Sequence, residues 1–182
     1  MLSKTQVPRI GYKKILYTTD LSEAGRQAFP HAASLARAYG ADLTVFHVME
    51  PREFEKFLVG YINDDVWDEI KTRNLAEARD ILVRRKRENT AIKDSVEQFC
   101  RDATEDPQQD PYVTYDVVVD MGDPVDRIVE HAHNGGYDLV IIGKRGQGVM
   151  DGGLMGDTAR RVIRHCQVPV MVVPVREKSG DD

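Results

Sequence analysis

Five short apolar runs alternate with longer amphipathic stretches along the chain. The runs cover residues 13–19, 43–49, 112–119, 139–142 and 168–175. Their lengths and their β-branched and aromatic content predict buried β-strands. The run 139–142 is apolar on both faces, which is typical of a parallel sheet covered on both sides. Pro169 and Pro174 predict an edge or end position for the last strand, because proline cannot donate to a strand ladder.

Apolar residues at helical spacing predict a helix after the first strand. Residues 20–22 indicate a turn and an N-cap, and the apolar positions over 28–39 follow with Gly40 as a stop signal. Pro30 lies inside this pattern, so it is expected to bend the helix or to displace its first turn.

Further helical patterns follow later in the chain. One begins at Pro124, since proline suits the first position of a helix, and ends at the glycine pair 135–136. Another covers 158–165. A charged stretch over 64–89 and an amphipathic stretch over 92–99 predict helical structure in the middle of the chain.

The alternation of strands and helices predicts an α/β fold, a doubly wound five-stranded parallel sheet with helices on both faces. At 182 residues the chain is expected to form a single domain, 1–182. Within it we expect a loose arm over 1–10, an enlarged helical and loop region over 51–110, and a disordered tail over 176–182. Ligands in such sheets bind beyond the carboxyl ends of the strands, near the switch in strand order.

Charge and cysteine content restrict the class of partner. The net charge of −5 gives no electrostatic reason to expect a nucleic acid or an anionic membrane. No apolar run approaches the ~20 residues that span a bilayer, and no signal-peptide core follows the start, so a cytoplasmic protein is expected. Cys100 and Cys166 lack C-x-x-C spacing, which favours free thiols.

The passage from the fourth strand to the last helix carries the clearest chemistry. Gly143, Gly146 and Gly156 follow a G-x2-G-x9-G spacing. Glycines let backbone N–H groups approach an anion, and the N-terminus of the following helix adds partial positive charge. The passage is neither a Walker A loop nor a dinucleotide fingerprint. It is therefore either a phosphate site or a flexible loop with glycines for tight turns.

Several segments in the right order resemble the universal stress protein family. The segment KKILYTTDLSE resembles the family's first strand and the aspartate turn after it, and FHVMEP resembles its second strand. MGDP resembles the start of its third helix, and IRHCQVPVMVVPV its C-terminal strand. Nucleotide-binding members carry the same glycine spacing followed by Ser or Thr. The resemblance covers nearly the whole chain except 51–110.

This resemblance implies a Rossmann-like fold and a site for ATP or another adenine nucleotide. It places adenine near Asp20 and Val48, and the ribose near Thr18. It places the phosphates against Gly143, Gly146 and Gly156, with Lys144 and Arg145 adding positive charge nearby. It further implies a homodimer, paired through the last strand over 168–175, that acts as a stress-response regulator.

Asp157 departs from the family pattern, since it stands where a hydroxyl residue follows the third glycine. A carboxylate ~4 Å from a phosphate oxygen costs roughly 4 kcal/mol per charge pair at an effective dielectric of 20. Asp157 could instead cap the helix by accepting the N–H of Ala159 or Arg160, thereby closing the site. Two features favour binding: a divalent cation, Mg²⁺ or Mn²⁺, could bridge the carboxylate and a phosphate, and Thr158 could supply a hydroxyl.

Two alternatives to a nucleotide-binding regulator therefore stay open. One is a nucleotide-free dimeric protein-interaction module whose phosphate site is closed by Asp157. The other is a slow nucleotide hydrolase, for which no positioned base can be named. No catalytic residue and no metal ligand set is predicted, because His131 and His133 should face different directions on their helix. His47 is interpreted as a hydrogen-bonded core residue, and the basic run 84–87 as a solvated helix face.

Overall fold

The computed structural model describes residues 10–50, 90–102, 114–146 and 155–174. Most of the expected N-terminal arm, the basic run 84–87 and the expected C-terminal tail lie outside the described residues. Only the part from Thr90 to Asp102 of the enlarged middle region lies within them.

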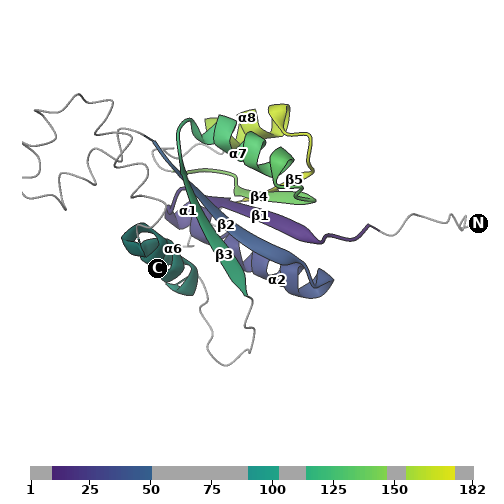
Figure 1. Cartoon of the computed structure of the whole chain (residues 1–182). Helices are drawn as coiled ribbons and strands as arrows, with labels where there is room; N and C mark the ends of the chain where they lie inside the picture. The colour runs from purple at the N-terminus through teal and green to yellow at the C-terminus, as the bar shows by residue number, and fades with distance from the viewer. Residues whose placement is uncertain (1–9, 51–89, 103–113, 147–154, 175–182) are drawn as a thin grey trace, which may run out of the picture.

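A five-stranded parallel sheet forms the centre of the molecule (Figure 1). Its order is β3-β2-β1-β4-β5, and every neighbouring pair is parallel. The strands are β1 (Lys14–Thr19), β2 (Asp42–Met49), β3 (Tyr115–Met121), β4 (Leu139–Gly143) and β5 (Val170–Val173). The order reverses between β1 and β4, so the carboxyl ends of these two strands mark the switch point of the sheet.

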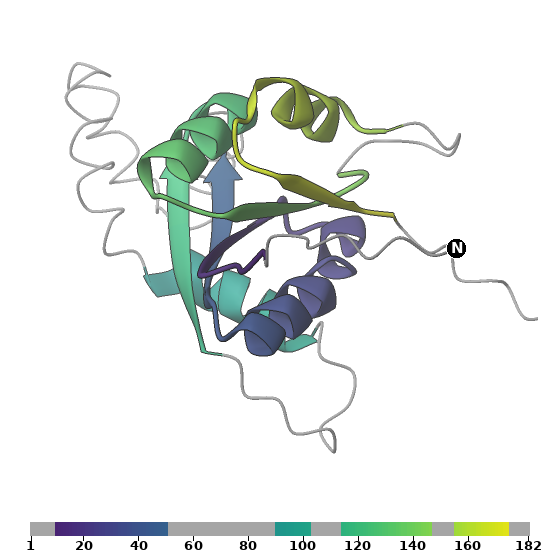
Figure 2. The same ribbon diagram turned by 90° about the vertical axis from the view of Figure 1, so that its right-hand side faces the viewer.

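Helices cover both faces of the sheet, which confirms the predicted doubly wound architecture (Figure 2). The helices α2 (Phe29–Tyr39) and α6 (Thr90–Asp102) lie on one face. The helices α7 (Pro124–Asn134) and α8 (Asp157–His165) lie on the other. Each face therefore has its own apolar core, the first containing Tyr17, Phe29 and Phe99, the second containing Phe46, Ile128 and Val162.

The helical segment after β1 is divided in two by local chemistry. The short helix α1 (Glu23–Arg26) begins where the Ser22 hydroxyl accepts the Gly25 N–H. The chain restarts as α2 with Pro30 in its first turn, where no intrahelical N–H is needed. Gly40 ends α2 in a left-handed conformation with φ of 62°, which favours glycine. Of the two outcomes predicted for Pro30, a bend in the helix or a displaced first turn, the structure shows the displaced first turn.

The start of α7 is also set by its own sequence. The Asp123 carboxylate accepts the N–H groups of Val125 at 2.9 Å and Asp126 at 3.1 Å. Pro124 occupies the first turn and Gly135 caps the C-terminus, in agreement with the predicted bounds. Because the helix begins directly after β3, its first turn lies at the carboxyl edge of the sheet.

The sequence pattern misplaced the ends of two strands. The third strand was expected over 112–119 but covers Tyr115–Met121, paired with β2 from Leu43 onward, and residues 112 and 113 lie outside the described residues. The last strand was expected over 168–175 but covers Val170–Val173, between the two prolines, and residue 175 lies outside the described residues. Its expected edge position is correct, since β5 pairs only with β4 in the described sheet.

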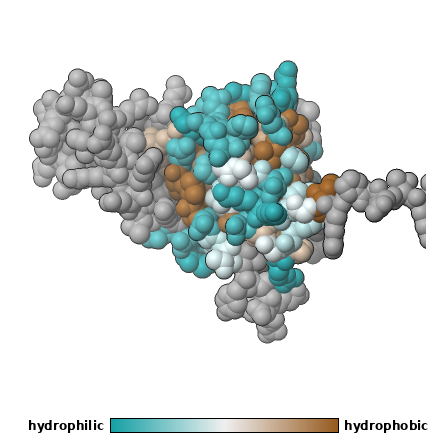
Figure 3. Space-filling view, turned by 45° about the vertical axis from the view of Figure 1, so that its right-hand side comes forward, coloured by the Kyte–Doolittle hydropathy of each residue, from teal (hydrophilic) through white to brown (hydrophobic). Residues whose placement is uncertain are grey.

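The outer surface of the described molecule is largely polar. Figure 3 shows one face on which hydrophilic residues predominate and hydrophobic residues form separate patches. Four large hydrophobic side chains are exposed among the described residues, namely Ile10, Tyr39, Met155 and Ile163. Within the same residues, no helix has both the length and the apolar character needed to cross a membrane.

Candidate functional site

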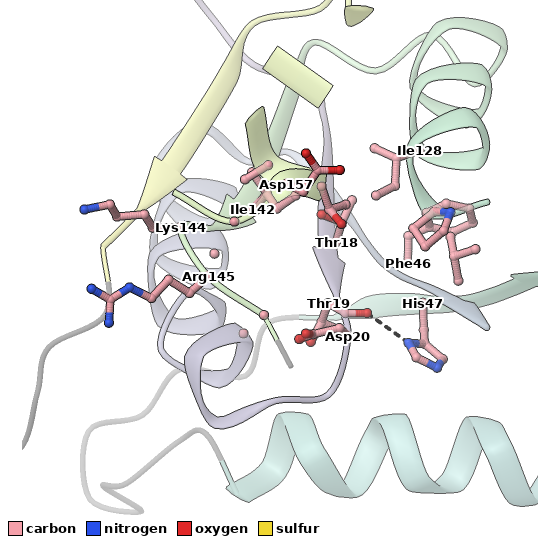
Figure 4. A pocket seen from close by; sticks show the side chains of 18 of the residues that line it. Thr18, Thr19, Asp20, Phe46, His47, Ile128, Ile142, Lys144, Arg145 and Asp157 are labelled. Carbon is pink, nitrogen blue, oxygen red and sulfur yellow. Dashed lines mark hydrogen bonds between the residues drawn. The ribbon is translucent and has the colours of Figure 1, made fainter. Parts of the chain in front are cut away.

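A cavity of about 330 Å³ lies at the switch point of the sheet. This volume is within the range of roughly 300–1,000 Å³ that is typical of small-molecule sites. Its walls come from the carboxyl ends of β1, β2 and β4, the first turn of α7, the glycine loop and the first turn of α8. Figure 4 shows these side chains around the opening.

All ten residues that the sequence assigned to the site line this one cavity. They are Thr18, Asp20, Val48, Gly143, Lys144, Arg145, Gly146, Gly156, Asp157 and Thr158. They come from three parts of the chain that pairing of β1 with β2 and β4 brings together. The geometry thus assembles the predicted residues, whereas their role in binding stays a prediction.

One wall of the cavity is apolar. Phe46 and Val48 come from β2, Ile142 from β4 and Ile128 from the inner face of α7. All four side chains belong to the core between the sheet and helices α7 and α8. The wall is therefore held by core packing, and a flat apolar group could lie against it without reorganising the fold.

The turn after β1 places a carboxylate at the cavity. Asp20 Oδ1 accepts the Ser22 N–H at 3.1 Å and the Ser22 hydroxyl at 2.6 Å. The other oxygen, Oδ2, lies so close to Gly146 that a Cβ at position 146 would overlap it. Glycine at this position lets the loop approach the carboxylate, whereas a larger residue would require the Asp20 side chain to move.

His47 fixes the relative position of β1 and β2 at the cavity edge. Its side chain is 6% exposed, and Nδ1 lies 2.9 Å from the carbonyl oxygen of Thr19, its pairing partner in β1 (Figure 4). Because a carbonyl oxygen only accepts, the hydrogen of this bond belongs to Nδ1. The expectation of a hydrogen-bonded core histidine is therefore correct, and the same residue also lines the cavity.

The third glycine is not required by the backbone. Gly156 is the N-cap of α8, with φ of −59° and ψ of 151°, and its N–H donates to the Lys144 carbonyl at 2.9 Å. A Cβ added at Gly156 would meet its nearest atoms at 3.5 Å or more, which is ordinary contact. The fold alone would accept alanine here, so the smaller residue leaves space beside a helix N-terminus that faces the cavity.

Asp157 does not cap α8 in the way that the sequence suggested. The expected self-cap is wrong, because Gly156 occupies the N-cap and Asp157 is the first helical residue. Its Oδ1 instead lies 2.6 Å from the Arg160 guanidinium, and its Oδ2 lies 3.9 Å from Arg161. Arg161 also reaches the Asp123 carboxylate at 3.7 Å, which connects the first turns of α8 and α7.

The basic residues of the glycine loop extend away from the apolar wall. Figure 4 shows the side chains of Lys144 and Arg145 on the opposite side of the loop from Phe46 and Ile128. The loop itself is held to the sheet, since the Lys144 N–H donates to the Val173 carbonyl at 2.7 Å. Positive charge therefore lies along the loop and not at the centre of the cavity.

The sequence did not identify several lining residues, among them Gly25, Thr19, Phe46, His47, Glu50, Pro124, Ile128, Ile142 and Ala159. A usable signal existed for some of them. Carboxyl ends of parallel strands meet at one edge, so the residues that end β2 and begin α7 belong near the site.

The described residues contain no group of three or more His, Cys, Asp or Glu side chains placed to hold a metal ion. Asp20, Glu50 and Asp157 line the cavity without forming such a group. His131 packs on Phe46 whereas His133 is exposed, so the two face different directions, as expected.

The sheet order and the cavity at its switch point define a Rossmann-like α/β domain. The profile of the Universal stress protein family matches residues 11–174, and the chain belongs to this family. The family resemblance drawn from the sequence is thereby confirmed.

Individual relatives agree with this assignment. The chain is 28% identical to Universal stress protein MJ0577 of Methanocaldococcus jannaschii, over 89% of this chain and 94% of that protein. It is 26% identical to Universal stress protein YxiE of Bacillus subtilis, over 89% of this chain and 99% of that protein.

Solved structures share the fold. Universal stress protein UspA from Lactobacillus plantarum is similar with a TM-score of 0.61 and 20% identity, covering 91% of this chain and 99% of that one. A universal stress protein solved in complex with cAMP is similar with a TM-score of 0.53 and 21% identity, covering 91% of this chain and 98% of that one.

Proposed function

We propose that this universal stress protein binds an adenine nucleotide in the cavity at the switch point and acts as a homodimeric stress-response regulator in the cytoplasm. The observation that carries the proposal is the convergence of all ten predicted residues on one cavity of about 330 Å³. A nucleotide needs an apolar surface for its base and N–H donors for its phosphates, and this cavity offers both.

The base would lie against the apolar wall formed by Phe46, Val48, Ile128 and Ile142. Val48 is also favourable for hydrogen bonding, because pairing between β1 and β2 ends at Thr19 and His47. Beyond that pair, the side of β2 that faces β1 is not covered by this strand. Backbone groups there can recognise the polar edge of a base.

The phosphates would lie along the glycine loop and the first turn of α8. Helix N-termini bind anions through their N–H groups and the helix dipole. Gly156 supports this placement. Its backbone conformation and surroundings would both accept a Cβ, so the glycine is not explained by the fold and is consistent with space for a ligand. Mg²⁺ or Mn²⁺ would accompany a polyphosphate, because the lining also carries the carboxylates of Asp20 and Glu50.

A related fold has been solved with such a ligand. The universal stress protein in complex with cAMP shares the architecture of this chain at 21% identity. Its ligand is an adenine nucleotide, which supports the same ligand class here. ATP itself is the family expectation, and Asp157 is the residue that bears on the choice of phosphate number.

The homodimer would form through the C-terminal segment 168–175. The strand β5 lies at the edge of the sheet, and Val170, Met171 and Val172 are only partly buried in the described chain. An uncovered apolar edge strand risks non-specific association. Pairing with a second copy would cover it.

Calorimetric titration of the purified protein tests the nucleotide proposal. AMP, cAMP and ATP are each added with and without Mg²⁺, and nucleotide carried through purification is measured by chromatography of the denatured sample. We expect saturable binding of at least one adenine nucleotide. No heat and no change in melting temperature below millimolar ligand would overturn the proposal in favour of a nucleotide-free interaction module.

A further inference from the structure

The first turn of α8 contains a charge arrangement that the family motif does not predict. Asp157 lines the cavity, and its carboxylate contacts Arg160 at 2.6 Å and Arg161 at 3.9 Å. Arg161 also contacts Asp123 at 3.7 Å. Two carboxylates thus balance two guanidinium groups beside the N-terminus of the helix.

We infer that Asp157 is an internal competitor for terminal phosphates, so that the site favours adenine nucleotides with one phosphate over triphosphates. This inference rests on the proposed function. The carboxylate contacts Arg160 and Arg161, which lie beyond the cavity lining in α8, so a polyphosphate that extends past the glycine loop would compete with Asp157 for them. A triphosphate must displace the carboxylate from the guanidinium groups and then tolerate its charge nearby. A single phosphate on the glycine loop does neither.

The exposure of the ion pairs makes this competition possible. The side chains of Asp157, Arg160 and Arg161 are 61%, 66% and 42% exposed. Exposed pairs of this kind are weak, because water screens them and because ordering long side chains costs entropy. The carboxylate can therefore be displaced, but it is tethered beside the guanidinium groups and is always present at high local concentration.

The rest of the lining agrees with a ligand of low charge. Among the described lining residues, the acidic side chains are Asp20, Glu50 and Asp157, and the basic ones are Lys144 and Arg145. The basic side chains extend along the far side of the glycine loop (Figure 4). Each additional phosphate adds negative charge to a cavity that already holds carboxylates. Because Asp157 contacts two guanidinium groups, it is also less suited to bridge a metal ion to the phosphates.

A double-mutant cycle tests the inference by calorimetry with AMP and ATP, each with and without Mg²⁺. The variants are Asp157→Ser, Arg160→Ala and the combination of both, together with Asp157→Asn, which removes charge but keeps the size of the side chain. Arg164→Ala is the matched control, because it removes one positive charge from the same helix one turn beyond Arg160. Melting temperatures verify that each variant folds.

We expect the unmodified protein to bind AMP at least as tightly as ATP. Asp157→Ser and Asp157→Asn should tighten ATP binding on the order of tenfold, the size of one charge-assisted hydrogen bond, and AMP binding much less. Arg160→Ala should weaken ATP binding strongly in the Asp157→Ser background but little in the unmodified protein. Arg164→Ala should behave alike in both backgrounds.

The outcomes separate the two proposals. ATP bound at least tenfold more tightly than AMP by the unmodified protein would overturn the inference and leave nucleotide binding intact. The inference would also be overturned if the Asp157 variants gained equal affinity for AMP and ATP. The same holds if their gain in ATP affinity did not depend on Arg160. If neither the unmodified protein nor any Asp157 variant binds a nucleotide, both the proposed function and this inference fail.

Discussion

The imidazole of His131 lies parallel to the phenyl ring of Phe46, with ring centroids 4.3 Å apart and an interplanar angle of 5°. His131 Nε2 lies 3.3 Å from the Tyr137 hydroxyl, which donates to Thr44 Oγ1 at 3.0 Å. Lys14 Nζ lies 4.6 Å from the centre of the Tyr137 ring. A histidine of α7 is thus built into the packing of a residue that lines the cavity.

This packing predicts a contribution of His131 to the pH dependence of stability. Burial is the main cause that lowers its pKa in the folded protein and Lys14 lowers it further, while Asp120 and Glu130 oppose this shift. The unfolded chain therefore binds the proton more readily. The free energy of unfolding should fall as pH drops below about 6.5, until the pH passes the folded pKa.

Urea unfolding between pH 5 and 8 measures this contribution. His131→Phe keeps an aromatic ring on Phe46 but removes the titration, so its stability should depend less steeply on pH. His133→Phe is the control, because His133 is exposed on the same helix. Equal pH dependence of His131→Phe and the unmodified protein would contradict this role of His131.

The two cysteines should differ sharply in reactivity. Burial raises the pKa of the Cys100 thiol to about 12, and the nearby Glu97 carboxylate also raises it, while Tyr115 and Arg101 have the opposite effect. The thiol therefore stays protonated, and only the thiolate reacts with alkylating reagents. Cys166 is partly exposed.

Alkylation with iodoacetamide at pH 8, followed by mass spectrometry of peptides, measures this difference. Cys166 should react in the native protein, and Cys100 only after denaturant is added. A Cys166→Ser variant should take up almost no reagent when folded. Rapid native labelling of Cys100 would show that α6 opens from the sheet far more often than its packing indicates.

Two glycines of the motif should respond differently to alanine. Gly156→Ala should change the free energy of unfolding by less than about 1 kcal/mol, because a Cβ fits there and only the N-cap preference changes. Gly146→Ala should cost roughly 1–2 kcal/mol, because the new Cβ overlaps Asp20. Urea titration of both variants provides the comparison.

The cause of the Gly146→Ala effect can be isolated with a second variant. Asp20→Ala removes the overlapping carboxylate, so the added cost of Gly146→Ala should largely vanish in that background. If Gly146→Ala lowers the free energy of unfolding equally in both backgrounds, the effect arises in the backbone of the loop and not from Asp20. If phosphates bind as proposed, Gly156→Ala should also weaken nucleotide binding while leaving stability nearly unaltered.

The N-cap of α7 should contribute measurably to stability. Asp123→Ala removes both hydrogen bonds from the carboxylate to the first turn and should cost about 1 kcal/mol. Asp123→Asn keeps an acceptor for the cap and loses only the charge that faces Arg161. Its cost should be at most half as large by thermal unfolding, and the reverse order of the two variants would contradict the capping role.

The proposed dimer predicts a concentration-dependent sedimentation coefficient. Val170→Lys places a charge on the partly buried edge strand β5 and should shift the protein towards the monomer, raising the dissociation constant at least about tenfold. Tyr39→Lys, at an exposed site on α2, should have no such effect. A dimer that survives Val170→Lys would place the interface elsewhere.

The sequence predicted most accurately the features that are determined locally. Helix α2 ends at Gly40, and helix α7 begins at Pro124 and ends at the glycines that follow it. The backbone preferences of these residues determine the helix ends, so the local sequence is enough to predict them. The strand run around Tyr115 was placed too early, because its first paired residue depends on β2, more than 70 residues back in the chain.

The candidate site was predicted in composition but not in detail. Aspartate is a favoured N-cap, which suggested that Asp157 would cap α8. The Gly156 N–H bond to Lys144 instead places the glycine at the cap, and Arg160 at i+3 takes the carboxylate. Ile128 could not be assigned to the cavity, because a helical pattern alone does not say which face of the sheet the helix covers.

The central pair of strands joins distant parts of the chain. The Asp138 carboxylate accepts hydrogen bonds from the backbone N–H groups of Lys13 and Lys14. Lys14 precedes Asp138 by 124 residues, and the contact lies at the amino end of the paired strands β1 and β4. Such contacts close a long loop and are expected to form late in folding. During synthesis, the part that contains β1, β2 and β3 emerges first and carries only the lining residues that precede α7. The cavity is therefore completed only when the last strands dock, so a ribosome-bound chain that ends near Met121 should have no working pocket.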